Sequence, residues 1–289
     1  MIKIAVLSGK GGAGKTTVAT NFALSLSGVG RGVQLFDADV EEPNARLFLH
    51  PNFGDRSEPV RRRIPVVDAE KCTLCQTCVE FCQFNALAKL GSRIVVYPEA
   101  CHSCGGCKQV CTANAISESD RDVGLLQWDA DVSGIEFWQG ELFVGEESAV
   151  PVIRALMQHI DDRKIAILDA PPGTACPAVE VAESSDFCLL VAEPTPFGLH
   201  DLQMTVETIA MLNKPWGLVI NRSEGEADKP LEAYAREQEI PILLKIPFDR
   251  GFAELYSRGI PFVDRYPSWK PRFRELWNRI RSPHPVKVS

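Results

Sequence analysis

Eight cysteines between residues 72 and 111 constrain this chain more than any other feature of its sequence. They form two runs with the same spacing, C-x2-C-x2-C-x3-C, and 101 − 72 and 111 − 82 both give an offset of 29. The same offset relates Glu70 to Glu99 and Asn85 to Asn114. Repetition at a fixed period indicates a duplicated structural unit. The runs comprise Cys72, Cys75, Cys78 and Cys82, followed by Cys101, Cys104, Cys107 and Cys111.

The spacing resembles that of bacterial ferredoxins, which hold two 4Fe-4S clusters. In those proteins the fourth cysteine of each run ligates the other cluster, so the resemblance implies crossed ligand sets. One set is Cys72, Cys75, Cys78 and Cys111, and the other is Cys101, Cys104, Cys107 and Cys82. Zinc is the alternative occupant, because paired C-x2-C units also bind it. Gln83 and Thr112 replace the usual proline after the fourth cysteine, which alters the turn but not the number of ligands.

A phosphate-binding loop is expected near the start of the chain. The apolar run 2–7 predicts a buried strand, and a helical pattern extends to about Leu26. The sequence between them, GKGGAGKTT, matches G-x4-G-K-S/T in the strand–loop–helix context that this motif requires. Backbone N–H groups are expected to face the phosphates, Lys15 to reach the outer phosphates, and Thr16 to coordinate Mg²⁺. The predicted nucleotide-binding residues here are Gly11, Gly12, Ala13, Gly14, Lys15, Thr16 and Thr17. An ordinary glycine-rich turn is the alternative.

The extra lysine, Lys10, makes the loop resemble the deviant Walker A motif of the MinD/ParA class, which includes the nitrogenase iron protein and Mrp-type cluster carriers. The resemblance implies an ATP-hydrolysing dimer in which Lys10 reaches the partner's nucleotide. The sequence D-A-P-P-G-T from Asp169 resembles the Walker B and switch II segment of the class. It implies that Asp169 holds Mg²⁺ through water and that the Gly173 amide senses the γ-phosphate. By the same resemblance, Asn221, Pro247 and Asp249 surround the adenine.

Two further acidic residues follow the apolar run 33–36. Asp37 and Asp39 thereby lie at a strand's carboxyl end, where α/β sheets bind ligands. The segment resembles switch I, which implies that Asp39 orients the attacking water and Asp37 supports the magnesium shell. A solvated pair that caps the following helix is the alternative.

Apolar runs at 165–168, 187–191, 216–220 and 243–246 alternate with helical patterns at 150–160 and 199–212. This order predicts an α/β fold: a mostly parallel, doubly wound P-loop sheet with an inserted small α+β ferredoxin-type domain. The expected divisions are 1–60 for the first part of the ATPase, 61–120 for the insert and 121–289 for the second part. We expect a loop at 51–59, a strand at 64–67, a hairpin at 88–97 and short segments between 123 and 147. Arg61–Arg63 are expected to be solvated, with docking of an acidic partner as the alternative.

Composition limits the partners. The formal charge of −7 gives no general attraction to nucleic acid, and no run reaches the 18 apolar residues of a membrane span. With eight of ten cysteines in the two runs, a reducing, cytoplasmic setting is expected. The amphipathic stretch 269–281 is expected to pack as the last helix of the fold, ended by Pro283 and Pro285. A membrane anchor like that of MinD is the alternative.

Two cysteines lie outside the runs. Cys176 follows Asp169 by seven residues, the spacing of a cluster ligand in the nitrogenase iron protein, and is a candidate metal ligand. Cys188 lies in an apolar run and is expected in the core.

Three functions compete. The sequence favours an ATPase whose dimer switching drives electron transfer or metallocofactor assembly on a protein partner, either as a homodimer or with a related ATPase. The alternatives are a carrier that delivers a cluster to apo-proteins, and a membrane-bound spatial organiser.

Overall fold

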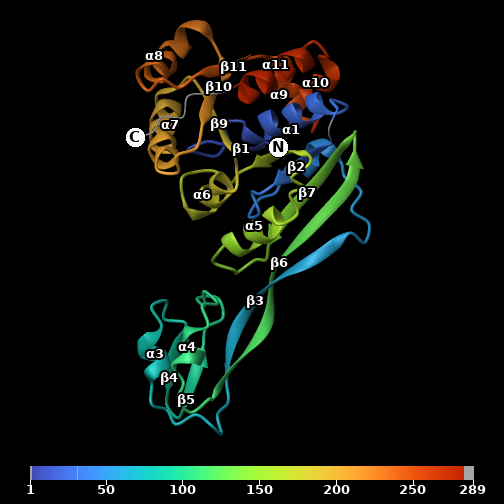
Figure 1. Ribbon diagram of the computed structural model, residues 1–289. Coiled ribbons are helices and arrows are strands. Elements are labelled where there is room, and N and C mark those ends of the chain that lie inside the picture. Colours follow the sequence, from blue (N-terminus) through green and yellow to red (C-terminus); the bar gives the residue numbers. More distant parts are fainter. Residues whose placement is uncertain (1, 31, 283–289) are drawn as a thin grey trace.

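The computed structural model describes residues 2–30 and 32–282, which form two lobes joined by a long antiparallel ribbon (Figure 1). The larger lobe, which contains the expected phosphate-binding loop, is built on a nine-stranded sheet in the order β11-β10-β9-β1-β8-β2-β7-β6-β3. Strands from β11 to β7 are parallel, and β6 and β3 continue the edge in antiparallel fashion. The predicted α/β class and mostly parallel sheet are confirmed. The strands are β1 (Lys3–Leu7), β2 (Val33–Asp37), β3 (Ser57–Val67), β6 (Ile116–Val132), β7 (Ile135–Leu142), β8 (Ile165–Asp169), β9 (Phe187–Ala192), β10 (Trp216–Ser223) and β11 (Ile242–Pro247).

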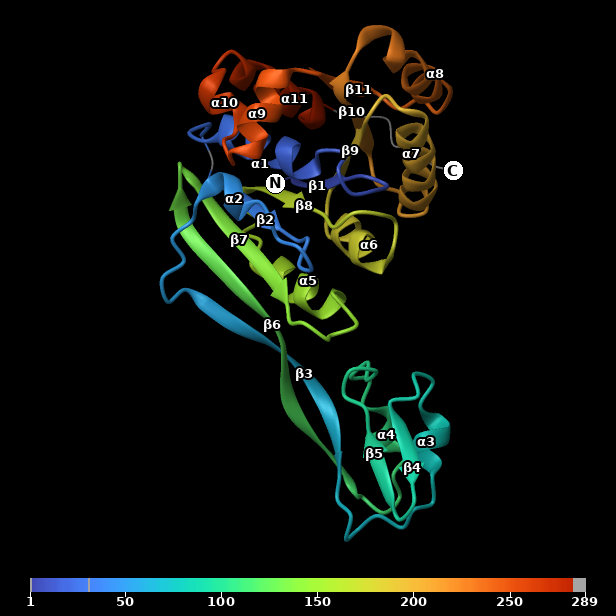
Figure 2. The ribbon, with the colours of Figure 1, turned by 180° about the vertical axis from the view of Figure 1, so that it is seen from behind.

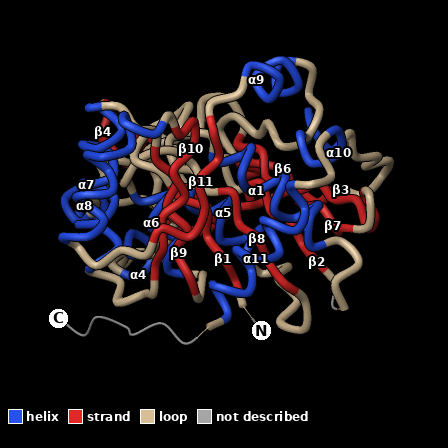
Figure 3. The backbone as a smooth tube through the Cα atoms, turned by 90° about the horizontal axis from the view of Figure 1, so that it is seen from above, coloured by secondary structure: helices blue, strands red, loops and turns tan. Residues whose placement is uncertain are grey.

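Helices cover both faces of this sheet (Figure 3). Successive residues of β1 point to opposite faces, so Ile4 and Val6 join one buried cluster while Ala5 and Leu7 join the other. The first face carries α1 (Lys15–Leu26), α10 (Phe262–Arg265) and α11 (Trp269–Arg281). The second carries α5 (Val150–Met157), α6 (Cys176–Glu183), α7 (Pro196–Ala210) and α8 (Lys229–Glu237). Short elements complete the lobe: α2 (Arg46–Leu49), the 3-10 turn η1 (Gly225–Asp228) and α9 (Arg250–Ser257).

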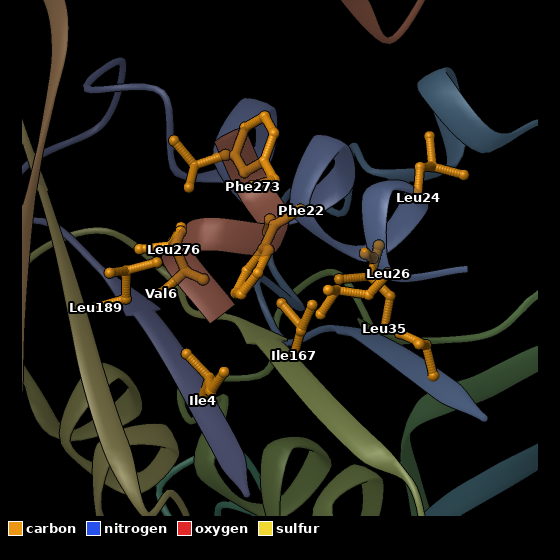
Figure 4. Close-up of a cluster of buried hydrophobic side chains, with 14 of the residues drawn as sticks. Ile4, Val6, Phe22, Leu24, Leu26, Leu35, Ile167, Leu189, Phe273 and Leu276 are labelled. Atoms are coloured by element: carbon orange, nitrogen blue, oxygen red, sulfur yellow. The ribbon is translucent and has the colours of Figure 1, made fainter. Parts of the chain in front are cut away.

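The helix α11 buries its apolar face in the fold. Phe273 is fully buried, and its ring lies 6.0 Å from that of Phe22 on α1 (Figure 4). Leu276 and Ile280 join the same cluster, while the arginines of the helix remain outside the core. The prediction that this stretch packs as the last helix is confirmed; Pro283 and Pro285 lie outside the described residues. Among the described helices, none has the length and apolarity to cross a bilayer.

The ribbon formed by β3 and β6 differs from the sequence-based expectation. β3 begins at Ser57, so the expected loop at 51–59 is wrong for its last three residues, and 64–67 is the end of a longer strand. β6 runs unbroken over 17 residues where several short segments were expected. Pro59 and Pro65 are tolerated because β3 is an edge strand, where a missing N–H need not break a ladder.

The far end of the ribbon carries the cysteine lobe, residues 68–115 (Figure 2). An N–H of Asp68 that donates to the Ala115 carbonyl at 2.8 Å closes it. The lobe contains α3 (Thr77–Phe81), the hairpin β4 (Leu87–Leu90) and β5 (Arg93–Val96), and α4 (Gly106–Gln109). A third apolar cluster, separate from those on the sheet, fills it and includes Ala86, Leu87 and Ile94. The expected divisions at 60/61 and 120/121 fall within β3 and β6, and the domain assignment stays a prediction.

We predict that Phe273→Ala destabilises the protein by about 3–5 kcal/mol, because it removes a fully buried ring from between α11 and α1. Chemical denaturation monitored by circular dichroism measures the loss. Met211→Ala, at a side chain that is 75% exposed, is the control and should change stability by less than about 0.5 kcal/mol. Equal, small effects of the two substitutions would show that α11 is not part of the core.

Candidate functional site

The phosphate loop connects β1 to α1. Gly14 has φ of 94°, and a Cβ there would collide with the amide of Asn221, so the position requires glycine. Lys15 is buried, and its Nζ donates to the Ser8 hydroxyl at 3.1 Å. Burial lowers the pKa of Lys15, and the carboxylates of Asp169 and Asp39 oppose that shift. In the part of the chain that the structure describes, the carboxylates near Lys15 thus affect its pKa without forming an ion pair at contact distance.

Asp37 and Asp169 lie side by side at the ends of β2 and β8, where they are register partners. Both are fully buried, and among the described residues no donor meets either carboxylate oxygen of Asp169 with regular hydrogen-bond geometry. Burial raises the pKa of Asp169 from 3.8 to about 7, with Lys15 and Thr16 opposing the shift. Buried polar atoms normally have partners, and hard divalent cations prefer carboxylate oxygens. Asp169 and the nearby Thr16 hydroxyl, whose interaction lowers the pKa of Asp169, fit a magnesium site.

The neighbouring carboxylates have different surroundings. Asp37 accepts hydrogen bonds from the N–H of Ala45 at 2.9 Å and of Asp39 at 3.2 Å, so it orders the segment after β2. Burial and the charge of Asp169 raise the pKa of Asp37 well above its ordinary value. Burial likewise raises the pKa of Asp39 to about 6, against the effect of Lys15. Asp39 lines the same cleft as the phosphate loop.

This cleft of about 300 Å³ is of the size expected for a small ligand. Gly11, Gly12, Gly14, Lys15, Thr16, Thr17 and Asp39 line one part of it, and Asn221, Pro247 and Asp249 line another. The structure thus brings these predicted residues together from the carboxyl ends of four strands, β1, β2, β10 and β11. Sequence analysis missed Arg222, Phe248, Phe252 and Tyr256, which also line the cleft. The available signal was Phe248, directly after Pro247, together with Phe252 and Tyr256 at four-residue spacing on α9.

Several predicted residues already have partners within the chain. The Asn221 side chain donates to the Ala13 carbonyl at 2.9 Å, and Asp249 caps α9 by accepting from the Gly251 N–H at 2.6 Å. The Gly173 amide donates to the Ser8 carbonyl at 3.0 Å. Lys10 lies 3.7 Å from Asp201 on α7, and 5.8 Å from the centre of the Phe197 ring. The roles inferred for these residues stay predictions. Each role requires that the contact described here be replaced by a contact with the nucleotide.

The cysteine lobe contains two cavities. Cys72, Cys75, Cys78 and Cys111 line one of them. Cys82, Cys101, Cys104 and Cys107 line the other. The fourth cysteine of each run therefore lies with the first three of the opposite run, as in the crossed ligand sets. In the part of the chain that the structure describes, no three His, Cys, Asp or Glu side chains converge on a point that would suit a single metal ion.

The backbone around the cysteines repeats with the sequence. Left-handed φ values occur at Leu74 and Ser103, at Gln76 and Gly105, and at Asn85 and Asn114, each pair separated by the 29-residue offset. Such residues turn successive N–H groups inward and create binding sites for anions. The N–H groups of Ala86 and Ala115 donate to the sulfurs of Cys82 and Cys111 at 3.4 and 3.3 Å.

Three of the eight thiols, those of Cys78, Cys101 and Cys107, are buried, whereas Cys75 and Cys104 are exposed. Burial raises the pKa of Cys78, to which Cys111, Cys72 and Cys75 contribute, and raises that of Cys107 to about 11. Thiolates in such surroundings need a positive centre, which metal ions supply. The donor set, eight thiols with inward amides, therefore fits iron–sulfur clusters. Cys176 is the exposed first residue of α6, and Cys188 is buried on β9 as expected.

A parallel sheet with a phosphate loop after β1 and carboxylates at the ends of β2 and β8 defines a P-loop nucleotide-binding protein. The chain belongs to the CobQ/CobB/MinD/ParA nucleotide-binding domain family, whose model matches residues 4–262. The MinD/ParA members of this family are ATPases.

Two relatives and one solved structure illustrate the similarity. An uncharacterized protein of Methanocaldococcus jannaschii is 30% identical over 284 residues, 97% of each chain. An iron-sulfur cluster carrier protein of Pyrococcus horikoshii is 26% identical over 280 residues, 90% of this chain and 79% of the relative. In fold, the chain is similar to the septum site-determining protein MinD of Pyrococcus horikoshii with Mg-ADP, at 19% identity and a TM-score of 0.61 over 98% of this chain and 97% of that one.

We predict that Asp169→Asn stabilises the magnesium-free protein at pH 8 by a few kcal/mol. Because the pKa of Asp169 is raised from 3.8 to about 7 in the folded state, its contribution to stability is fully present below about pH 4. That contribution is lost as the pH rises through about 7, and a neutral asparagine avoids the loss. Denaturation of both proteins between pH 4 and pH 8, in EDTA, measures it.

The matched control is Asp162→Asn, at a side chain that is 85% exposed, which should leave the pH profile unchanged. The same stability difference between wild type and Asp169→Asn at pH 4 and pH 8 would contradict the placement of a buried carboxylate with a raised pKa at this position.

Proposed function

We propose that this protein is a magnesium-dependent ATPase that carries two 4Fe-4S clusters and couples its nucleotide state to their use on a protein partner. The partner receives electrons or a metallocofactor component. The observation that carries the proposal is the sorting of the eight cysteines into two cavities of four, each built from both runs. These two cysteine-lined cavities occur in the same chain as a phosphate-binding cleft of the MinD/ParA family.

The chemistry of the cleft supports turnover of ATP. Lys15 and the bound cation neutralise charge on the phosphates. In a homodimer, or in a dimer with a related ATPase, Lys10 reaches the nucleotide of the other subunit and adds a second positive group there. Asp39 lies at the rim of the cleft and, with a pKa of about 6, is an ionised acceptor for the attacking water near neutral pH. Asp169 and Thr16 hold the cation, which supplies charge neutralisation when bound.

The cysteine lobe is the proposed ferredoxin-type insert, with the two ligand sets that the spacing implies. Each fourth cysteine also accepts an N–H bond from the alanine four residues later, and such bonds stabilise a cluster's negative charge. Stable clusters with four protein ligands each favour electron transfer over release. The proposal includes no nucleic acid partner and no membrane anchor, since α11 is packed into the core.

A carrier that delivers a cluster to apo-proteins is the second candidate. The relatives named iron-sulfur cluster carrier proteins, from three species of Pyrococcus and from Aquifex aeolicus, favour it. So does Cys176, an exposed thiol at the start of α6, which is the kind of open ligand that a transient cluster would use.

We predict that anaerobically purified protein contains about eight iron and eight sulfide ions per chain, four for each cluster, and little zinc. Elemental analysis and sulfide determination measure them. Cys101→Ser should lower the iron content by about half and leave nucleotide binding intact, whereas Cys188→Ser, at a buried residue of β9, should change neither. Stoichiometric zinc in wild-type protein would contradict the proposal.

Reduction and transfer experiments separate the two candidates. For the proposed function, dithionite reduction and reoxidation should return the starting spectrum with no loss of iron, because both clusters have complete ligand sets. Incubation of ⁵⁵Fe-loaded protein with an apo-ferredoxin should then transfer little label. Rapid, ATP-dependent transfer that is lost in Cys176→Ser would establish the carrier instead.

A further inference from the structure

The ribbon carries a buried ion cluster at the point where it leaves the nucleotide-binding lobe. Arg62 on β3 and Arg121 on β6 are register partners, so two like charges face each other across the ladder. Such a pair destabilises a sheet unless another group intervenes. Glu146, from the loop between β7 and α5, lies between them: one oxygen accepts from Arg62 Nη2 at 2.6 Å and the other from Arg121 Nη2 at 2.7 Å.

In this cluster of Arg62, Arg121 and Glu146, which we call the joint, Arg62 and Glu146 are buried and Arg121 is 33% exposed. Arg62 is only 7% exposed and Glu146 only 3%, against the expectation that the three consecutive arginines are solvated. Its neighbours Arg61 and Arg63, 55% and 61% exposed, behave as expected. Buried charges are retained only with good partners, so the joint fixes the loop after β7 against both strands of the ribbon.

On one side the joint holds part of the second ligand set. Arg62 Nη1 donates to the carbonyl of Cys101 at 2.9 Å, and Arg121 Nη2 lies 3.0 Å from a carboxylate oxygen of Glu99. The counterpart segment at the 29-residue offset, Glu70 to Cys75, is held by its own lobe instead, since Asp68 accepts from the N–H groups of Glu70 and Cys72. The segments that carry the two ligand sets therefore differ in their contact with the joint.

On the other side the joint connects to the nucleotide cleft. The Leu142 N–H, at the end of β7, donates to the carbonyl of Val40 at 2.7 Å, directly after Asp39 of the cleft. One residue further, the Phe143 N–H donates to Val123, which sits at a bulge in the ribbon, and the Glu146 N–H donates to Phe143. Only short, hydrogen-bonded steps separate Asp39 from Glu146.

From these contacts we propose that Glu146 and Arg62 are positioning residues through which nucleotide-dependent movement at Asp39 repositions the Cys101 loop, and with it the second cluster more than the first. The inference rests on the proposed function. The first cluster, held by Asp68 within the cysteine lobe, responds less. A displacement of the loop after Val40 moves Glu146 relative to the ribbon, and the fork of Arg62 passes that movement to the carbonyl of Cys101.

Hydrogen exchange of the iron-loaded full-length protein tests the inference, with Mg-ADP compared with the magnesium complex of a non-hydrolysable ATP analogue. Wild-type protein should show a nucleotide-dependent change in exchange at 99–104 that exceeds any change at 70–75. In Glu146→Gln the difference between nucleotides at 99–104 should vanish, and exchange there should be about tenfold faster in both states, because a buried charge has lost its partner. Arg61→Gln, at the adjacent exposed residue, is the matched control and should behave as wild type.

Arg62→Lys keeps the charge and provides the conservative variant. A lysine cannot bind Glu146 and the Cys101 carbonyl together in the planar geometry of the guanidinium, so the nucleotide-dependent difference should again be lost. If Glu146→Gln does not fold, Arg62→Lys alone tests the inference. Two results would overturn the inference. One is a nucleotide-dependent change at 99–104 that persists undiminished in the folded variant proteins. The other is wild-type exchange that depends on the nucleotide at 37–42 but not at 99–104. Iron content and ATP turnover, measured on the same samples, show independently whether the proposed function stands.

Discussion

The backbone ladder between β3 and β6 is the interaction on which the two-lobe arrangement depends. It runs in continuous antiparallel pairing from Ser57 opposite Gln127 to Val67 opposite Ile116, with a single register shift after Val60. The other edge of β6 pairs with β7, which lies next to β2 and its terminal Asp37. A flexible linker would leave the lobes free to reorient, whereas a hydrogen-bonded ribbon resists bending and transmits displacement. The cysteine lobe is therefore an extension of the sheet edge.

The two ends of this framework have complementary electrostatic demands. In the nucleotide-binding lobe, burial raises the pKa of two adjoining carboxylates, Asp37 and Asp169; in the cysteine lobe, burial raises the pKa of the Cys78 and Cys107 thiols. Both arrangements cost free energy in the bare chain. Functional sites commonly contain groups whose burial destabilises the fold. Here both kinds of group, carboxylates and thiols, are negatively charged when ionised, and a bound metal ion would offset that charge. The joint shows a third solution, in which Glu146 neutralises two facing arginines within the protein itself.

Sequence patterns predicted the parts of the fold whose signals are local. Apolar runs such as 165–168 located the buried parallel strands, and the phosphate-loop motif together with Asp39 indicated one wall of the cleft. The amphipathic period of 269–281 identified a helix whose apolar face packs against the core, where Phe273 contacts Phe22. In each case a short segment carries both the pattern and the physical reason for it.

The remaining features depend on contacts between distant residues. Residues 117–122 of β6 are polar on both faces, so no alternation marks them as a strand; their pairing with β3 does. Arg62 is buried because Glu146, 84 residues away, meets it, and the adjacent Arg61 gives no hint of the difference. The aromatic wall of the cleft at Phe252 and Tyr256 depends likewise on where α9 folds back over the phosphate loop. Tertiary packing, absent from any window of the sequence, decides all three.

The central claim is that events at the nucleotide cleft alter clusters at the far end of the ribbon. A potentiometric titration followed by EPR tests it most directly, with anaerobic iron-loaded protein in Mg-ADP and, separately, in the magnesium complex of a non-hydrolysable ATP analogue. The account predicts two interacting S = 1/2 signals, at least one of which changes its reduction potential or line shape between the nucleotides. Two superimposable titrations would contradict it.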